Sequence, residues 1–173
     1  MIRKLTEKDA QNLDLIGVLV FNINKNYSET EKEFWGDAVE RTSPTAFQKE
    51  IIQNNVLAYF EKEQVLGSVA YEIKGTEAKF GMLSVNLQDH GKRIGSQLCR
   101  AMEDDLMSQG VSKLHLELLV PRNYESENKN NIRDWYERNG FESVDRIQAE
   151  DFPNLPFQQL LIESDFIKMT KNL

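Results

Sequence analysis

The chain has few of the features that mark several common protein classes. Cys99 is its only cysteine, which excludes an intrachain disulfide and a cysteine-based metal cluster and suits a reducing cytosol. No window approaches the roughly 18 apolar residues of a membrane span. The first ten residues, MIRKLTEKDA, lack the apolar stretch of a signal peptide. We therefore expect a cytoplasmic protein with no membrane association and no metal.

Positive charge is also scarce. The sequence has 21 Lys and Arg against 28 Asp and Glu, a formal net charge of −7. A nucleic-acid partner is not expected, because binding it requires a basic face. The acidity is compatible with a cationic substrate such as an amine, and it would equally serve solubility alone.

Two familiar phosphate-binding motifs are missing from the 173 residues. There is no Gly-x-x-x-x-Gly-Lys-Ser/Thr and no Gly-x-Gly-x-x-Gly, so the chain has neither a Walker P-loop nor a dinucleotide fingerprint. We also find no internal repeat, no low-complexity tract and no linker. The length fits one domain, residues 1–173.

Hydrophobic periodicity predicts an α+β protein with a central sheet of mixed direction. Thr6 and Asp9 have capping-box spacing before a helix expected over residues 10–24, and Pro44 follows a helix cap at Ser43. A third helix should bury Leu98, Cys99, Met102 and Leu106. The remaining predictions are strands at 2–5, 56–63, 64–73, 78–85, 113–120, 141–147 and 165–173, and a short helix at 132–138 after a polar loop.

The stretch GMLSVNLQDHGKRIGSQL, residues 81–98, predicts a strand, a tight polar turn and a helix start. If the strands before and after this helix are parallel, the unit is a right-handed crossover, and ligands bind such units where the strands end. Backbone N–H groups and the helix dipole then point at one spot. The turn therefore predicts an anion site.

This stretch resembles the acetyl-coenzyme A motif of the GNAT N-acetyltransferase superfamily. Val85, Gly91, Lys92, Ile94 and Gly95 match the common form of that motif. Three positions depart from it: Leu87 replaces a proline, His90 replaces an arginine or glutamine, and Arg93 replaces a glycine.

A second signature follows at the expected separation. NNIRDWYERNGFE resembles the Asn-rich helix of the family and its Tyr-x-x-x-Gly-Phe, matched by Tyr136, Gly140 and Phe141. With both ends of the chain, the resemblance extends over nearly the whole sequence. It implies a GNAT-type acyl-CoA N-acyltransferase fold, in which helices flank a mixed, mostly antiparallel sheet that is splayed between two adjacent parallel strands.

The resemblance implies an N-acetyltransferase that uses acetyl-CoA as cosubstrate. The acetyl group would move to a primary amine of a small molecule or peptide by direct attack in a ternary complex. A CoA-binding sensor or regulatory module with little or no turnover is the alternative, suggested by Arg93 and by Lys79, which stands where a catalytic glutamate is common. A homodimer is possible, as in many proteins of this family.

The coenzyme site can be assigned by position. A bulge in the strand would free backbone N–H groups for the thioester and pantetheine arm, and the backbone of the turn would hold the pyrophosphate with help from two cations. A glycine at position 93 would permit positive φ, whereas an arginine can offer its N–H if φ is negative. The expected residues are Leu83, Ser84, Val85, His90, Gly91, Lys92, Arg93, Ile94, Gly95, Ser96 and Asn130.

Asn130 is assigned to the pantetheine arm. The residue that matches the family's asparagine is Lys129, and Asn130 follows it. A turn-forming role for this Asn cluster is the alternative.

For catalysis, the resemblance assigns Tyr136 as the general acid that protonates the leaving thiolate; simple packing of its ring against the sheet is the alternative. Glu117 is the candidate base, with Glu72 and His115 as other possibilities, and a water chain could replace all three.

The acceptor pocket is expected in the polar stretch 27–41. Tyr27, Phe34 and Trp35 would form its walls, and the acidic residues Glu29, Glu31, Glu33 and Asp37 would attract an ammonium group. A surface loop held down by its aromatic residues is the alternative.

Overall fold

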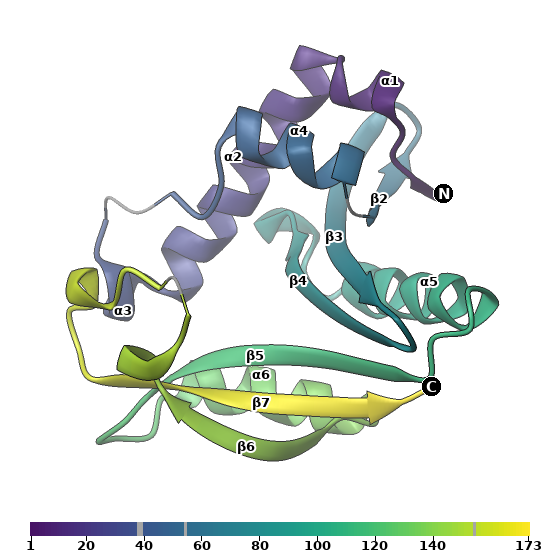
Figure 1. Cartoon of the computed structure of the whole chain (residues 1–173). Helices are drawn as coiled ribbons and strands as arrows, with labels where there is room; N and C mark the ends of the chain where they lie inside the picture. Colours follow the sequence, from purple (N-terminus) through teal and green to yellow (C-terminus); the bar gives the residue numbers. More distant parts are fainter. Residues whose placement is uncertain (38–39, 54, 154) are drawn as a thin grey trace.

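A computed structural model describes residues 1–37, 40–53, 55–153 and 155–173 (Figure 1). Its centre is a seven-stranded sheet with the order β1-β2-β3-β4-β5-β7-β6. Neighbouring strands are antiparallel except β4 and β5, which are parallel. The predicted mixed, mostly antiparallel sheet is therefore confirmed. The strands are β1 (Ile2–Lys4), β2 (Asn55–Glu61), β3 (Gln64–Lys74), β4 (Glu77–Val85), β5 (Lys113–Pro121), β6 (Glu142–Gln148) and β7 (Ser164–Asn172).

Helices cover both faces of this sheet. They are α1 (Glu7–Ala10), α2 (Leu13–Thr30), α3 (Lys32–Trp35), α4 (Pro44–Gln53), α5 (Ile94–Ser108) and α6 (Glu127–Arg138). The capping box of Thr6 and Asp9 starts the short α1, and Asn12 caps α2 by accepting from the N–H of Leu15. Both α2 and α6 are longer than predicted, because polar and Asn-rich turns in the sequence continue as helix.

The sheet splays between its two parallel strands. Residue pairing between β4 and β5 runs only from Glu77↔Lys113 to Lys79↔His115. Beyond that point β4 stays paired with β3 as far as Val85, and β5 stays paired with β7 as far as Pro121. Figure 1 shows β4 and β5 diverging from this end. The splay leaves the β5-facing edge of β4 unpaired from Phe80 onward.

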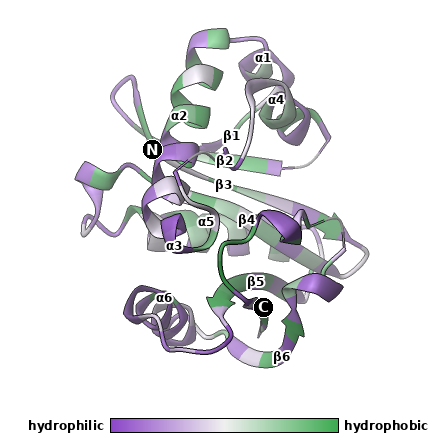
Figure 2. Cartoon of the chain, turned by 90° about the vertical axis from the view of Figure 1, so that its left-hand side faces the viewer, coloured by the Kyte–Doolittle hydropathy of each residue, from purple (hydrophilic) through white to green (hydrophobic). Residues whose placement is uncertain are grey.

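The apolar face predicted for the third helix forms the main core. Leu98, Met102 and Leu106 of α5 are fully buried where α5 packs on β2, β3 and β4, in a cluster that also contains Phe80 and Leu114. Helix α6 covers the same face and is mostly hydrophilic (Figure 2). It reaches the core through Ile132 and Tyr136.

The opposite face of the sheet has two smaller cores. Helices α2 and α4 pack on β2 and β3 there, and a separate cluster around Phe34 and Phe166 covers β5 and β7. None of the helices within the described residues is long and apolar enough to cross a bilayer.

Candidate functional site

The strand before the turn contains the predicted bulge. Ser68 pairs with Ser84 and Ala70 pairs with Gly81, so Met82 and Leu83 both lie opposite Val69. Met82 has φ of 49°, in the left-handed region. A bulge of this kind breaks the ladder and re-aims backbone N–H groups. It lies where β4 has already left β5, so it faces the splay.

The end of β4 is held by side chains from two other segments. Asn26 of α2 donates to the hydroxyl of Ser84, 3.0 Å away, and to the carbonyl of Val85. The imidazole Nε2 of His90 donates to the same carbonyl over 3.1 Å. The side chains of Ser84 and His90, both predicted to bind coenzyme, thus hold the end of the strand.

The turn at the start of α5 offers a group of free N–H donors. The N–H of His90 donates to Leu87 and that of Lys92 donates to Asp89, so these two are used within the turn. The other backbone N–H groups of the predicted stretch have no hydrogen-bond partner in the part of the chain that the structure describes; they belong to Gly91, Arg93, Ile94, Gly95 and Ser96. Successive free N–H groups at a helix start form an anion-binding concavity.

Arg93 has a different backbone conformation from the one expected. Its φ is 60° and its ψ is 19°, so it adopts the left-handed conformation that a glycine would take. The negative φ that the sequence reasoning named as the condition for an arginine to offer its N–H is therefore not present. The side chain makes this conformation cost about 1 kcal/mol, and the turn nevertheless keeps the shape that exposes its N–H groups.

Lys92 does not supply the free positive charge predicted for it. Its ammonium binds Asp89 over 2.6 Å, and this hydrogen bond raises the pKa of Lys92. Asp89 is buried. Arg93 makes no ion pair within the described residues, so it is the cation of this turn that is left for a ligand.

Tyr136 lies in an aromatic cluster on the α5 and α6 side of the sheet. Its ring centroid is 6.0 Å from that of Phe80 and 5.6 Å from that of Phe141. Burial raises the pKa of Tyr136 well above 10, and nearby Cys99 and Tyr27 add to this. Its hydroxyl has no hydrogen-bond partner among the described residues, so the ring is packed while the proton stays available.

Each candidate base has an ionic or hydrogen-bonding partner. Glu117 forms an ion pair with Lys79 on the face of β5 opposite the main core. His115 binds Glu77 over 2.8 Å, and Glu72 binds Lys74 over 3.2 Å. A proton acceptor for an amine would have to leave one of these pairs or act through water.

A cavity of about 180 Å³ lies where the acceptor pocket was expected. Tyr27 and Trp35 line it as predicted, but Phe34 is fully buried in the cluster with Phe166 and offers no surface to a ligand. The prediction for Phe34 is wrong because its ring points into the core. The complete lining is Tyr27, Ser28, Glu31, Trp35, Gly36, Glu40, Arg41, Leu155 and Pro156.

The acidic residues of this region have uses that the sequence did not indicate. Glu31 accepts from Lys129 and from the indole of Trp35, and Glu33 accepts from Tyr124 and Ser126. Asp37 binds Lys32 on the surface. Glu40, which the sequence reasoning missed, lines the cavity, and so do Leu155 and Pro156 from a loop more than 110 positions away.

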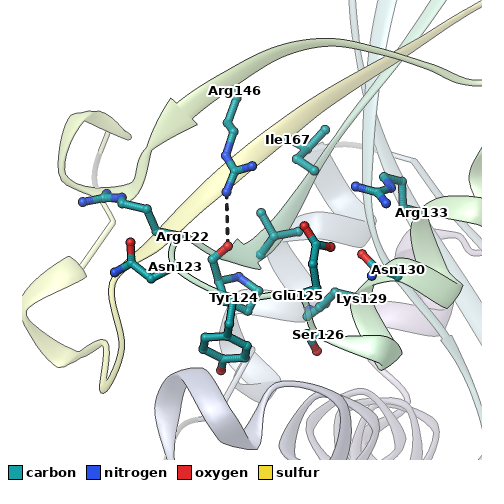
Figure 3. Close-up of a pocket in the computed structure, with 12 residues that line it drawn as sticks. Arg122, Asn123, Tyr124, Glu125, Ser126, Lys129, Asn130, Arg133, Arg146 and Ile167 are labelled. Carbon is teal, nitrogen blue, oxygen red and sulfur yellow. Dashed lines mark hydrogen bonds between the residues drawn. The ribbon is translucent and has the colours of Figure 1, made fainter.

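Asn130 lies in a different cavity, of about 280 Å³ (Figure 3). Its walls come from the end of β5, the loop that follows, α6, β6 and β7, and none of the described residues of β4 or α5 contributes. Arg146 crosses it to donate to the carbonyl of Pro121 over 3.2 Å. The structure therefore does not bring Asn130 to the bulge, and Lys129, at the matching position, is buried against Glu31.

Comparisons with known proteins agree with this geometry. A domain-family model described as an acetyltransferase (GNAT) domain matches residues 53–143. No curated protein matches the sequence.

Many solved structures share the fold at low identity. An aminoglycoside 6'-N-acetyltransferase complexed with coenzyme A has a TM-score of 0.76 at 15% identity, covering 99% of this chain and 96% of that one. PaiA N-acetyltransferase from Thermoplasma acidophilum, also in complex with coenzyme A, has a TM-score of 0.65 at 21% identity, covering 100% of this chain and 98% of that one. Ribosomal-protein-alanine N-acetyltransferase from Brucella melitensis has a TM-score of 0.66 at 18% identity, covering 100% of this chain and 99% of that one. The names of the first and the third of these proteins give different acceptors, an aminoglycoside and a ribosomal-protein alanine.

Proposed function

Because the chain belongs to the GNAT acetyltransferase family, we propose that it transfers an acetyl group from acetyl-CoA to a primary amine of a small molecule or peptide. The amine attacks the thioester directly while both are bound. The observation that carries the proposal is the group of free backbone N–H donors of Gly91 and of residues 93–96, next to a bulged strand at an open splay. A cytoplasmic location and a homodimer stay predictions from the sequence.

The turn fits the diphosphate of the coenzyme. Its N–H groups and the dipole of α5 favour an anion, and Arg93 adds a charge that no carboxylate among the described residues neutralises. The unpaired edge of β4 beyond Lys79 offers peptide groups to the amides of a pantetheine arm. The coenzyme itself supplies the activated acetyl thioester.

The bulge and Tyr136 are proposed to act on the two atoms of the C–S bond that breaks in the thioester. The backbone N–H of Leu83 is the group proposed to stabilise the oxyanion that forms on the acetyl carbonyl, because that of Met82 interacts with the hydroxyl of Tyr27. Tyr136, which burial keeps protonated, is the group proposed to protonate the departing sulfur. Tyr136 lies on the α5 and α6 side of the sheet, whereas Met82 of the bulge packs on the other side, and we propose that the amine arrives from that other side.

The cavity lined by Tyr27 and Trp35 is the proposed acceptor site on that other side. The side chain of Tyr27 packs in the same core as Met82, and its hydroxyl interacts with the backbone N–H of Met82. The cavity therefore borders the bulge. Aromatic walls with a carboxylate from Glu40 suit a cationic amine with an apolar body. Proton transfer from the amine then passes through water or through Glu117 after it parts from Lys79.

The second candidate function is a coenzyme-binding module without turnover. The pairing of Glu117 with Lys79 favours it, because the ion pair makes this candidate base less available to accept a proton. This module would bind coenzyme tightly and acetylate no amine, and Tyr136→Phe would not impair its function.

Calorimetric titration of acetyl-CoA tests the proposal. Gly95→Glu places bulk and negative charge at the turn, and the position tolerates a side chain, since a Cβ there would lie 3.8 Å from Val85. Gly17→Glu is the matched control, because a Cβ on Gly17 of α2 meets nothing within 4 Å. We expect micromolar binding by the native protein and the control and none by Gly95→Glu.

Two results would overturn the assignment. Absence of binding by the native protein would remove the enzyme and the sensor together. Equal binding by Gly95→Glu would place the diphosphate elsewhere. After positive binding, release of CoA thiol with a panel of amines separates the two candidate functions.

A further inference from the structure

Lys79 occupies a special place on β4. It forms the last residue pair with β5, opposite His115, before the two strands separate. Ala78 and Phe80 on either side of it face the main core, so the side chain of Lys79 points to the opposite face of the sheet. That face is the one from which an acceptor amine would arrive.

The ammonium of Lys79 lies beyond the last residue pair of β4 and β5, in the direction of the bulge. It binds Glu117, two residues beyond His115 on the parallel neighbour. On β4 itself, Lys79 lies three residues, roughly 10 Å along the strand, before Met82 and the bulge proposed to bind the thioester carbonyl.

The side chain of Lys79 is accessible although its nitrogen is paired with Glu117. The side chain of Lys79 is 51% exposed, and a Cβ added to Gly81 would meet no atom within 4 Å. Phe152 lies beneath the ammonium, with its ring centroid 5.5 Å from Nζ. An aromatic floor and one carboxylate describe a small site for a primary amine, and here the chain supplies the amine itself.

We propose that Lys79 is acetylated by the coenzyme bound in the same chain. This inference rests on the proposed function, since it uses the same thioester. The ammonium gives one proton to solvent by way of Glu117, and the neutral nitrogen attacks the acetyl carbonyl. The new C–N bond forms, the C–S bond breaks, and the sulfur takes the second nitrogen-bound proton by exchange through Tyr136 and water. The products are Nε-acetyl-Lys79, free CoA thiol and one proton.

The modification would change the site. Acetyl-Lys79 is neutral, so the ion pair with Glu117 is lost and that carboxylate becomes free to accept a proton from a second amine. The cation over Phe152 is lost as well. One acetylation event would thus convert the paired carboxylate into an available base.

Mass spectrometry of the purified protein incubated with acetyl-CoA and no acceptor tests the proposal. We expect a gain of one acetyl group, located by peptide mapping on Lys79. Lys74 is the internal control, because it also pairs with a glutamate and is more exposed, at 78%. Uncatalysed acetylation would therefore favour Lys74. The rate per molecule should not depend on protein concentration, and Lys79→Arg should take up no acetyl group.

The outcomes separate the two proposals. Selective labelling of Lys79 that is lost in Gly95→Glu and kept in Gly17→Glu supports self-acetylation. Labelling of Lys74 as fast as Lys79, or a rate per molecule that rises with protein concentration, overturns it. Turnover of external amines without labelling of Lys79 overturns it and leaves the enzyme intact. No labelling and no turnover of any amine, despite coenzyme binding, overturns both.

Discussion

The ammonium of Lys129 binds the carboxylate of Glu31 over 2.9 Å, although the two residues lie 98 positions apart. Both side chains are almost enclosed, at 3% and 13% exposure. The pair ties the first turn of α6 to the junction of α2 and α3. It therefore connects the helix that carries Tyr136 to a wall of the proposed acceptor cavity.

Removing one member of this pair should cost more than removing both. Glu31→Gln leaves a buried ammonium without its counter-charge, and we expect a loss of about 3 kcal/mol in the free energy of unfolding. The double variant Glu31→Gln, Lys129→Met should recover part of that loss. Urea unfolding of the single and double variants measures both values. Lys32→Met, which breaks an exposed pair with Asp37, should unfold like the native protein, and additive losses in the double variant would contradict this prediction.

The left-handed backbone of Arg93 can be separated from its charge. Arg93→Ala and Arg93→Gly both remove the guanidinium, but only glycine relieves the positive φ. We expect Arg93→Gly to be more stable than Arg93→Ala by about 0.5–1 kcal/mol in thermal or urea unfolding. Both should bind acetyl-CoA more weakly than the native protein, and to a similar extent, because both lose the same charge. An Arg93→Ala variant as stable as Arg93→Gly would mean that the turn relaxes to negative φ.

The hydroxyl of Tyr136 should matter for turnover and little for folding. It has no hydrogen-bond partner among the described residues, so Tyr136→Phe should keep the native melting temperature. Loss of the proton donor should lower kcat about 100-fold with little change in KM for acetyl-CoA. Tyr124→Phe, which removes a hydroxyl bound to Glu33, is the matched control and should leave kcat near its native value.

The pH profile gives a second check on Tyr136. Because burial raises its pKa above 10, the folded protein keeps this hydroxyl protonated through neutral and mildly alkaline pH. Loss of its proton should therefore contribute no decline in kcat as pH rises from about 7 to about 9. A decline in that range that disappears in Tyr136→Phe would contradict the assignment of a protonated acid.

Cys99 should be inert in the folded protein. Burial raises the pKa of its thiol to about 12, so almost no thiolate is present at pH 8. Ellman's reagent should detect no thiol in the native protein and one per chain in denaturant. Rapid labelling of the native protein would show that α5 opens readily. The expected result also means that the same reagent can report released CoA without interference.

The sequence was informative where function depends on a short contiguous stretch. The strand, turn and helix of residues 81–98, the bulge and the face of α5 that holds Leu98, Met102 and Leu106 were all predicted and found. Hydrophobic periodicity and local turn chemistry act over a few residues, so they can be read in order along the chain. The pairing of β4 with a parallel β5 was implied by the family resemblance, and the helix between the two strands is compatible with it.

Side-chain partners were decided by the tertiary structure. The sequence placed Lys92 at the phosphate, Phe34 in a pocket wall and Glu117 free for catalysis. In the folded chain, Lys92 instead forms an ion pair with Asp89, Phe34 is buried in a hydrophobic core, and Glu117 forms an ion pair with Lys79. A charged or aromatic side chain reaches several neighbours, and packing selects among them.

The amino-acid order thus determined which backbone groups are exposed at the end of β4, because left-handed turns and helix starts are local conformations. It did not determine which charges remain free around them. That choice depends on contacts such as Lys129 with Glu31 and Lys79 with Glu117. Their partners come together only when α2, α6 and the two parallel strands have packed, and the strength of such contacts depends on the burial that packing creates.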